Sequence, residues 1–208
     1  MNVKEGYQIW SAQYDTNENK TRDLEGKALQ ATLSKIKFDK VLEFGCGTGK
    51  NTVWLQHHAK QITAVDFSDA MLAIATEKVK SSNTQFVIAD INKPWDFTSE
   101  KFDLIAFSLV LEHIEHIDAV FEKIGDISND KAYVYISELH PFKQYAGSKA
   151  RFTTEVGEQI VTCFTHNISE FLQAANKYNF ELKVLEEWFD DDDKSKIPRI
   201  LTLLFQKK

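Results

Sequence analysis

Apolar positions along the chain follow two different periods, and the alternation between them predicts strands and helices in turn. Helical spacing or helix-capping residues mark four early segments, at 21–37, 50–58, 68–80 and 117–127. Compact apolar runs of the kind that buried strands require occur at 39–44, 61–66, 84–89, 102–108 and 132–137. Regular alternation of strand and helix implies an α/β fold, with a parallel sheet and helices on both of its faces.

The pattern changes after the fifth predicted strand. Residues 140–165 show no regular period and contain one proline and two glycines. Because a long irregular segment in a compact domain usually serves a function, we expect a lid here. A helix at 168–178 and two strands at 182–188 and 200–205 follow. The charged segment 190–196 is expected to join these strands as a solvated turn, so that they add an antiparallel edge to the sheet.

Composition narrows the class of protein. The 208 residues, of which 43% are hydrophobic and 27% are charged, suit one globular domain. Acidic residues (31) outnumber basic ones (25), and the formal charge of −6 disfavours nucleic acid as a partner. The two cysteines, Cys46 and Cys163, are too few for a disulfide framework. Since the chain shows neither a signal-peptide pattern nor an apolar run that could span a membrane, we expect a cytoplasmic protein.

A glycine-rich loop follows the strand at 39–44. Three glycines stand there at alternate positions, Gly45, Gly47 and Gly49. The dinucleotide fingerprint would need a further glycine where the chain has Lys50. The phosphate-binding loop would need a glycine at Phe44 and a serine or threonine at Asn51. Both of these alternatives fail, and a nicotinamide oxidoreductase is disfavoured with them.

The segment Glu43-x-Gly45-x-Gly47-x-Gly49 resembles the glycine loop of class I S-adenosylmethionine-dependent methyltransferases. S-adenosylmethionine has no pyrophosphate and carries an ammonium, a sulfonium and a carboxylate. An acidic strand end such as Glu43 complements the positive groups, whereas backbone N–H groups at a helix start suit the carboxylate. The resemblance extends from about Trp10 to Phe205. It implies a Rossmann-like sheet of seven strands that is mostly parallel and has an antiparallel last strand.

Acidic residues at the ends of the next two strands strengthen the resemblance. Asp66 lies 21 positions after Gly45 and suits the two ribose hydroxyls of the cofactor, with Phe67 beside it for the adenine. Asp90 and Ile91 end the third strand, where methyltransferases of this type hold the adenine amino group. The alternative for Asp66 is a cap of the following helix, and for Asp90 a turn residue. All these residues should meet in one crevice at the carboxyl ends of the strands.

Two further segments resemble the same family. The N-terminal Trp10-x-x-x-Tyr14-Asp15 is similar to an aromatic lead-in that folds over the cofactor. The fourth strand ends in Ser108-Leu-Val-Leu and lacks the Asn/Asp-Pro-Pro-aromatic motif of enzymes that methylate DNA bases or protein glutamine. Cys46 is expected in the loop as a small packing residue. The resemblance thus implies a cofactor-binding set of Glu43, Gly45, Cys46, Gly47, Gly49, Asp66, Phe67, Asp90, Ile91, Ser108 and Tyr14.

Methyl transfer is an in-line displacement in which the enzyme mainly aligns and desolvates its reactants. A general base is needed only where the acceptor cannot lose its proton alone. His113 and His116, after the fourth strand, and His140, at the start of the irregular segment, are candidates, and we favour His113 and His140. For each of these histidines, the alternative is a structural role in which the imidazole only makes a hydrogen bond that holds the fold. The acids and histidines of 112–116 match neither HExxH nor HxxEH, and no metal site is predicted.

The resemblance implies one methyltransferase domain with four parts. These are an N-terminal cap at 1–38, a cofactor-binding half at 39–139, a lid-like insert at 140–165, and a C-terminal helix with strands at 166–208. The expected function is transfer of a methyl group from S-adenosylmethionine to a small-molecule acceptor. Two alternatives remain open: a methyltransferase that acts on protein or RNA, and a non-catalytic partner subunit that binds S-adenosylmethionine.

Overall fold

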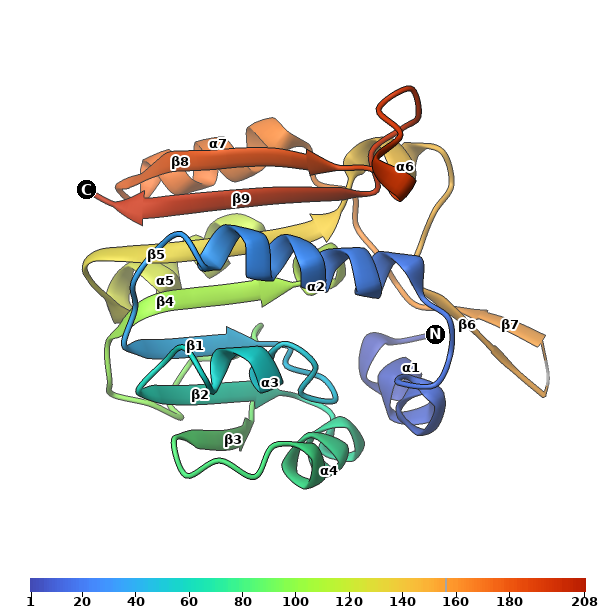
Figure 1. The fold of residues 1–208 in the computed structure, drawn as a ribbon, viewed down its shortest axis with the longest axis horizontal. Coiled ribbons are helices and arrows are strands. Elements are labelled where there is room, and N and C mark those ends of the chain that lie inside the picture. Colours follow the sequence, from blue (N-terminus) through green and yellow to red (C-terminus); the bar gives the residue numbers. More distant parts are fainter. Residues whose placement is uncertain (156) are drawn as a thin grey trace.

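A seven-stranded sheet forms the centre of the computed structural model, which describes residues 1–155 and 157–208 (Figure 1). Its strand order is β3-β2-β1-β4-β5-β9-β8. The strands are β1 (Lys40–Phe44), β2 (Gln61–Asp66), β3 (Thr84–Ile88), β4 (Phe102–Ser108), β5 (Ser128–Leu139), β8 (Phe180–Trp188) and β9 (Ile200–Lys207). Strands β1 to β5 pair in parallel, and β9 pairs antiparallel with both β5 and β8. The predicted sheet, with its antiparallel last strand, is confirmed.

Helices cover both faces of the sheet. They are α1 (Val3–Trp10), α2 (Lys20–Leu33), α3 (Thr52–Leu55), α4 (Asp69–Lys78), α5 (Ile117–Ile127), α6 (Pro141–Tyr145) and α7 (Ile168–Lys177), with short 3-10 turns η1 (Ser11–Gln13), η2 (Leu111–His113) and η3 (Asp190–Asp192). Leu29, Leu55 and Leu72 pack α2, α3 and α4 on one face, whereas Phe121 and Phe171 pack α5 and α7 on the other. Strands buried on both sides explain why the apolar runs show so little alternation.

Most predicted elements are confirmed, and the differences have local causes. The helix predicted at 50–58 is limited to the short α3, and turns occupy the residues on either side of it. The late strands are both present, but β9 lies inside the sheet between β5 and β8, so that of these two strands β8 alone lies at an edge. The segment 140–165, expected to be irregular, contains α6 and a hairpin of β6 (Arg151–Thr154) and β7 (Gly157–Ile160).

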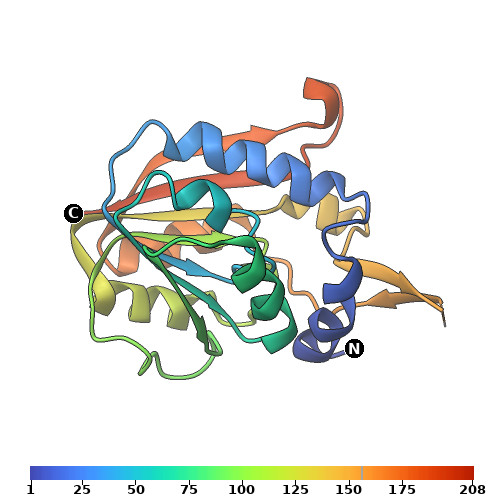
Figure 2. The same ribbon diagram turned by 60° about the horizontal axis from the view of Figure 1, so that its bottom comes forward.

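The N-terminal helix α1 lies beside the β6–β7 hairpin, beyond the carboxyl ends of β1 and β4 (Figures 1 and 2). Trp10, Phe152 and Val161 form a small apolar cluster between the two segments. The ring of Trp10 stacks on that of Phe152 with the centroids 5.0 Å apart. Two segments that are distant in the sequence therefore form one cap over the end of the sheet where the glycine loop lies.

Within the part of the chain that the structure describes, none of the helices combines the length and the apolar character needed to cross a bilayer.

Candidate active site

A cavity at the carboxyl ends of β1, β2 and β4 brings most of the predicted site residues together. We call it the cofactor cleft. Its walls include nine of the residues predicted from the sequence, namely Tyr14, Gly45, Gly47, Asp66, Phe67, Asp90, Ile91, Ser108 and His113. Parallel strands end at one edge of a sheet, and neighbouring strand ends place their following residues around a common crevice.

The glycine loop shapes one wall of this cleft. Gly45 has φ +64°, and a Cβ there would lie 2.2 Å from Cγ2 of Val110, so the loop and the chain after β4 approach too closely for any side chain. Gly47 has φ +53°, and a Cβ there would meet no heavy atom within 4 Å, which leaves open space along the loop. Cys46 and Gly49 do not line the cleft; Cys46 is buried in the core on the α2 side.

Asp66 lies at the wall of the cleft, where backbone N–H groups hold its carboxylate. One carboxylate oxygen accepts from the Gly47 N–H and the other from the Ser68 N–H, each at 2.9 Å. Ser68 itself caps α4, because its hydroxyl accepts from the Met71 N–H. Burial raises the pKa of Asp66, although these backbone hydrogen bonds act in the opposite direction. The carboxylate therefore fixes the glycine loop against the helix start and also lines the cleft.

Glu43 lies on the other side of the loop from its predicted place. Alternation along β1 turns its side chain toward α2 and α3, and it does not line the cleft. Its carboxyl accepts a 2.6 Å hydrogen bond from the hydroxyl of Thr52. Burial raises the pKa of Glu43 to about 8. The expected direct contact with a positive group of the cofactor is not supported by this position, and Glu43 instead holds the residues that follow the loop.

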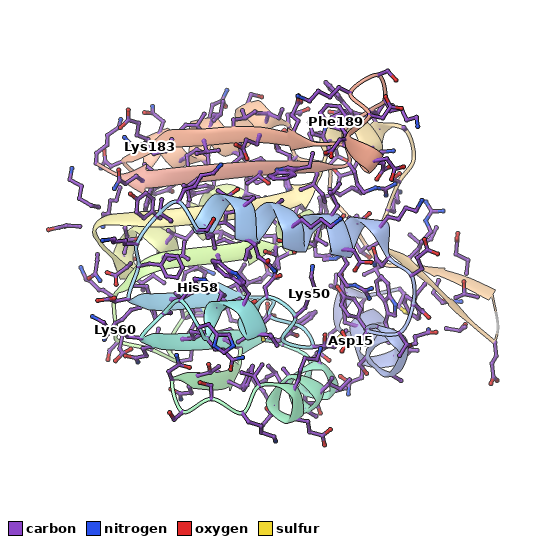
Figure 3. The ribbon with its side chains drawn as sticks, viewed as in Figure 1. Asp15, Lys50, His58, Lys60, Lys183 and Phe189 are labelled. Carbon is purple, nitrogen blue, oxygen red and sulfur yellow. The ribbon has the colours of Figure 1, made fainter. Side chains whose placement is uncertain are left out.

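Lys50, which occupies the position of the last glycine in the dinucleotide fingerprint, points toward α2 (Figure 3). Its ammonium donates to the Arg22 carbonyl and, at 3.2 Å, to the buried carboxylate of Glu25. A Cβ at Gly26 would lie 2.6 Å from Cε of Lys50, so this glycine makes room for the lysine side chain. The lysine thus anchors α2 to the loop and stays out of the cleft.

A second anchor joins the N-terminal segment to the glycine loop. Asp15 accepts from the hydroxyl of Thr48 at 2.7 Å and pairs with the ammonium of Lys78 on α4 at 2.5 Å. Partial burial raises the pKa of Asp15, but the hydrogen bonds from Lys78 and Thr48 outweigh it and lower the pKa below its ordinary value. This anchor holds the neighbouring Tyr14 at the cleft wall.

His113 lies at the cleft, with both of its ring nitrogens in hydrogen bonds. Nδ1 is 2.7 Å from the carbonyl oxygen of Thr162, and Nε2 is 2.9 Å from the hydroxyl of Tyr7. Because a carbonyl only accepts, Nδ1 carries the proton, and Nε2 accepts from the Tyr7 hydroxyl. Sequence reasoning missed Tyr7, although its spacing of three and seven positions before Trp10 and Tyr14 is typical of one face of a helix.

His140 lies outside the cleft, and its prediction as a base is not supported. Its side chain is fully buried and caps α6, since Nδ1 accepts from the Phe142 N–H at 3.2 Å. Nε2 lies 3.0 Å from the carboxylate of Glu187 on β8. Burial lowers the pKa of His140. The structural alternative therefore accounts for this residue, because both nitrogens serve the junction of β5, α6 and β8.

A second, larger cavity adjoins the cofactor cleft, and we call it the outer chamber. Tyr7, Tyr14 and Leu109 line both cavities and form the junction between them. The chamber is bounded by α1, the chain at 17–21 and the hairpin side at 149–153. Leu109 has φ +58°, a conformation that a leucine rarely adopts. This turn directs the chain after β4 along the boundary of the two cavities.

The outer chamber contains charges of both signs. Its outer part carries the basic residues Lys20, Lys149, Arg151 and Arg199. Arg199 is neutralised by a two-point pair with Asp190, at 2.5 and 2.6 Å. Deeper in the wall lies Glu112, whose side chain is only 6% exposed. Over residues 1–155 and 157–208, His, Cys, Asp and Glu side chains form no group of three that could hold a metal ion.

The chain also matches a known protein family. A family model described as "Methyltransferase domain" matches residues 17–184, which include both the glycine loop and the strand-end acids. The chain belongs to this methyltransferase family. This match confirms the resemblance inferred from the glycine loop, and it confirms the prediction that the protein is a methyltransferase enzyme.

Individual relatives agree with this assignment. An uncharacterized methyltransferase of Emericella nidulans is 24% identical over 217 residues, which span 86% of this chain and 75% of the relative. A putative S-adenosylmethionine-dependent methyltransferase of Listeria monocytogenes superposes with a TM-score of 0.74 at 19% identity, covering 89% of this chain and 99% of that one. The N-methyltransferase NodS of Bradyrhizobium japonicum, in complex with S-adenosyl-L-homocysteine, gives a TM-score of 0.73 at 16% identity and covers 100% of this chain and 99% of its own. At these identities the structural likeness shows the fold.

Proposed function

We propose that this methyltransferase transfers a methyl group from S-adenosylmethionine to a small-molecule acceptor. The observation that carries the proposal is the direct junction of two cavities at Tyr7, Tyr14 and Leu109. One cavity has the glycine loop and strand-end acids suited to a nucleoside cofactor. The other lies under the cap of α1 and the hairpin. A methyl group held at the junction would face an acceptor in the outer chamber.

The residues of the cleft fit the cofactor. Asp66 offers carboxylate acceptors for ribose hydroxyls, and Asp90 offers them for the adenine amino group. Phe67, Ile91 and the neighbouring Met71 supply apolar contacts for a purine ring. The open space over Gly47 lets a ligand approach the loop backbone closely. When bound, S-adenosylmethionine supplies a methyl group that its sulfonium activates.

The chain's own groups can align the acceptor and remove its proton. Tyr7 lines both cavities and donates its hydroxyl hydrogen to Nε2 of His113. An acceptor that loses a proton passes it to the phenol oxygen as the phenol proton moves to Nε2, which leaves Tyr7 neutral and His113 positively charged. Burial raises the pKa of Tyr7 well above its ordinary range, so the phenol remains protonated between transfers. Nδ1 keeps its hydrogen bond to Thr162 throughout.

Two measurements test this function. Titration calorimetry should show binding of S-adenosyl-L-homocysteine and much weaker binding of NAD, because the loop lacks the dinucleotide fingerprint. Incubation of the protein with methyl-labelled S-adenosylmethionine and a size-fractionated cell extract should place the label in the fraction of small molecules. Tighter binding of NAD would contradict the cofactor assignment, and label confined to protein or RNA would contradict the class of acceptor.

A further inference from the structure

Glu112 is a buried carboxylate without a cationic partner. The nearest basic nitrogen is Nε2 of His113, 4.0 Å from Oε1 of Glu112. That nitrogen accepts from Tyr7 and has no hydrogen to donate. Gln144 approaches the other oxygen at only 3.4 Å, and among the described residues no lysine or arginine nitrogen lies within 4.0 Å. A carboxylate removed from water without a compensating charge is costly, and a cationic ligand would relieve that cost.

The backbone around Glu112 is firmly held. The N–H groups of Val110, Leu111 and Glu112 all donate to the carboxylate of Glu138, at 3.0, 2.8 and 3.2 Å. The carbonyl of Glu112 accepts from Phe164 at 2.7 Å. Its side chain is therefore presented to the chamber from a fixed loop.

Aromatic rings beside this carboxylate add to the attraction for a cation. The adjoining chamber wall is aromatic, with Tyr7, Trp10 and Phe152 stacked in sequence at centroid distances of 5.6 and 5.0 Å. Aromatic faces attract ammonium groups, and aliphatic amines are ammonium ions at neutral pH.

We infer that the methyl acceptor is an amine, whose ammonium group binds to Glu112 at the inner end of the outer chamber. This inference rests on the proposed function and specifies its acceptor. A hydroxyl or carboxylate acceptor would leave Glu112 without a counter-charge, whereas an ammonium supplies one together with hydrogen-bond donors.

The reaction is then balanced in charge and protons. The ammonium first gives one proton through Tyr7 to Nε2 of His113, and the resulting imidazolium lies 4.0 Å from Glu112. The nitrogen lone pair then forms the bond to the methyl carbon while the bond from that carbon to sulfur breaks, and its electron pair neutralises the sulfonium. The product is a methylated ammonium, which is again paired with the Glu112 carboxylate.

Two matched probes test the inference without knowledge of the natural acceptor. Each is an analogue of S-adenosylhomocysteine in which nitrogen replaces sulfur and carries a three-carbon arm in the place of the methyl group. The arm ends in an amine in one probe and in a hydroxyl in the other. By calorimetry, the wild-type protein should bind the amine probe at least about tenfold more tightly than the hydroxyl probe, as expected for a charge-assisted hydrogen bond.

The variant Glu112→Gln should remove this preference and leave the affinity for the hydroxyl probe within about twofold, because the amide keeps the size and loses the charge. Glu115→Gln is the matched control, since Glu115 is exposed on the same loop and lines neither cavity; it should keep the full preference. Equal affinities of the wild type for both probes, or a preference that survives Glu112→Gln, would overturn the amine assignment. Failure of S-adenosylhomocysteine itself to bind would instead contradict the proposed function.

Discussion

The cofactor cleft and the outer chamber meet at three residues but are built in different ways. The cleft is made from strand ends and one loop of the sheet, and its central acid, Asp66, is fixed by backbone N–H groups. The chamber is made from α1, the chain after β4 and the β6–β7 hairpin, which are joined by side-chain packing around Trp10. A site that is held by the backbone hydrogen bonds of a sheet tolerates few substitutions. Side chains that pack into a wall beside the sheet, in contrast, can be replaced without disturbing it. The two cavities should therefore respond separately to mutation.

The largest effect of a mutation is expected at Gly45, where the glycine loop and the chain after β4 are in contact. Gly45→Ala would place Cβ 2.2 Å from Cγ2 of Val110 and strain a positive φ. We expect a loss of about 3–5 kcal/mol in the free energy of unfolding and loss of S-adenosylhomocysteine binding. Urea unfolding and calorimetry measure the two effects. Gly125→Ala is the control, since a Cβ there meets nothing within 4 Å in helix α5; equal behaviour of the two variants would contradict the close approach.

Phe152→Ala should affect the chamber alone. Phe152 is 4% exposed, stacks on Trp10 and lines only the outer chamber. Its loss should weaken attachment of the hairpin by about 3 kcal/mol and speed proteolytic cleavage of the cap, while S-adenosylhomocysteine binds as before. Phe142→Ala, at a residue that is 54% exposed, should change neither property. A parallel loss of S-adenosylhomocysteine affinity in Phe152→Ala would show that the two cavities are not separable.

His113→Ala tests the junction. Turnover should fall by about 100-fold, as for a lost general base, with the affinity for S-adenosylhomocysteine nearly unchanged. The exposed His57 gives the control variant His57→Ala, which should retain full turnover. Label transfer to the active small-molecule fraction measures the rate. A variant with normal turnover and a lower melting temperature would identify His113 as a structural residue.

Asp66→Asn should weaken the binding of S-adenosylhomocysteine in the cleft and leave the outer chamber unchanged. The amide loses the charge that holds the Gly47 and Ser68 N–H groups and that would receive the ribose hydroxyls. We expect the dissociation constant of S-adenosylhomocysteine to rise by about tenfold or more. Asp69→Asn, in the first turn of the same helix, is the control because Asp69 does not line the cleft. An unchanged dissociation constant would indicate that Asp66 only stabilises the glycine loop and the start of α4.

The smallest effect is expected at Asp15, which anchors the N-terminal segment to the loop. Since the pKa of Asp15 is lowered in the folded protein, its carboxylate stabilises the fold at pH values above its ordinary pKa of 3.8. That contribution is lost as the pH falls through the lowered value. We therefore measure the melting temperature of Asp15→Asn and of the wild type as a function of pH. The variant should melt about 1–2 °C lower at pH 7 and at the same temperature as the wild type at pH values below the lowered pKa of Asp15. A difference that is equal at all pH values would contradict the ionic anchor.

Much of the cleft could be predicted because its residues follow local rules. Each apolar run ends where its strand ends, and the residues directly after parallel strands converge on one edge of the sheet. Asp66, Phe67, Asp90 and Ile91 are placed by that rule alone. The direction of the Glu43 side chain could not be predicted, because it depends on the alternation within β1, and a strand that is buried on both faces does not reveal this alternation in its sequence.

Short-range patterns in the amino-acid sequence are enough to specify the sheet, the glycine loop and the family, because each depends on residues that are close together along the chain. The side chains that lie together where the cleft meets the outer chamber, in contrast, depend on tertiary packing. Tyr7, His113 and Thr162 meet from three distant segments, and the hydrogen bonds between them select the histidine tautomer. Glu112 became distinctive only when the fold buried it without a cation. No local pattern encodes such a contact, because the charge balance of a buried group depends on every segment that packs around it.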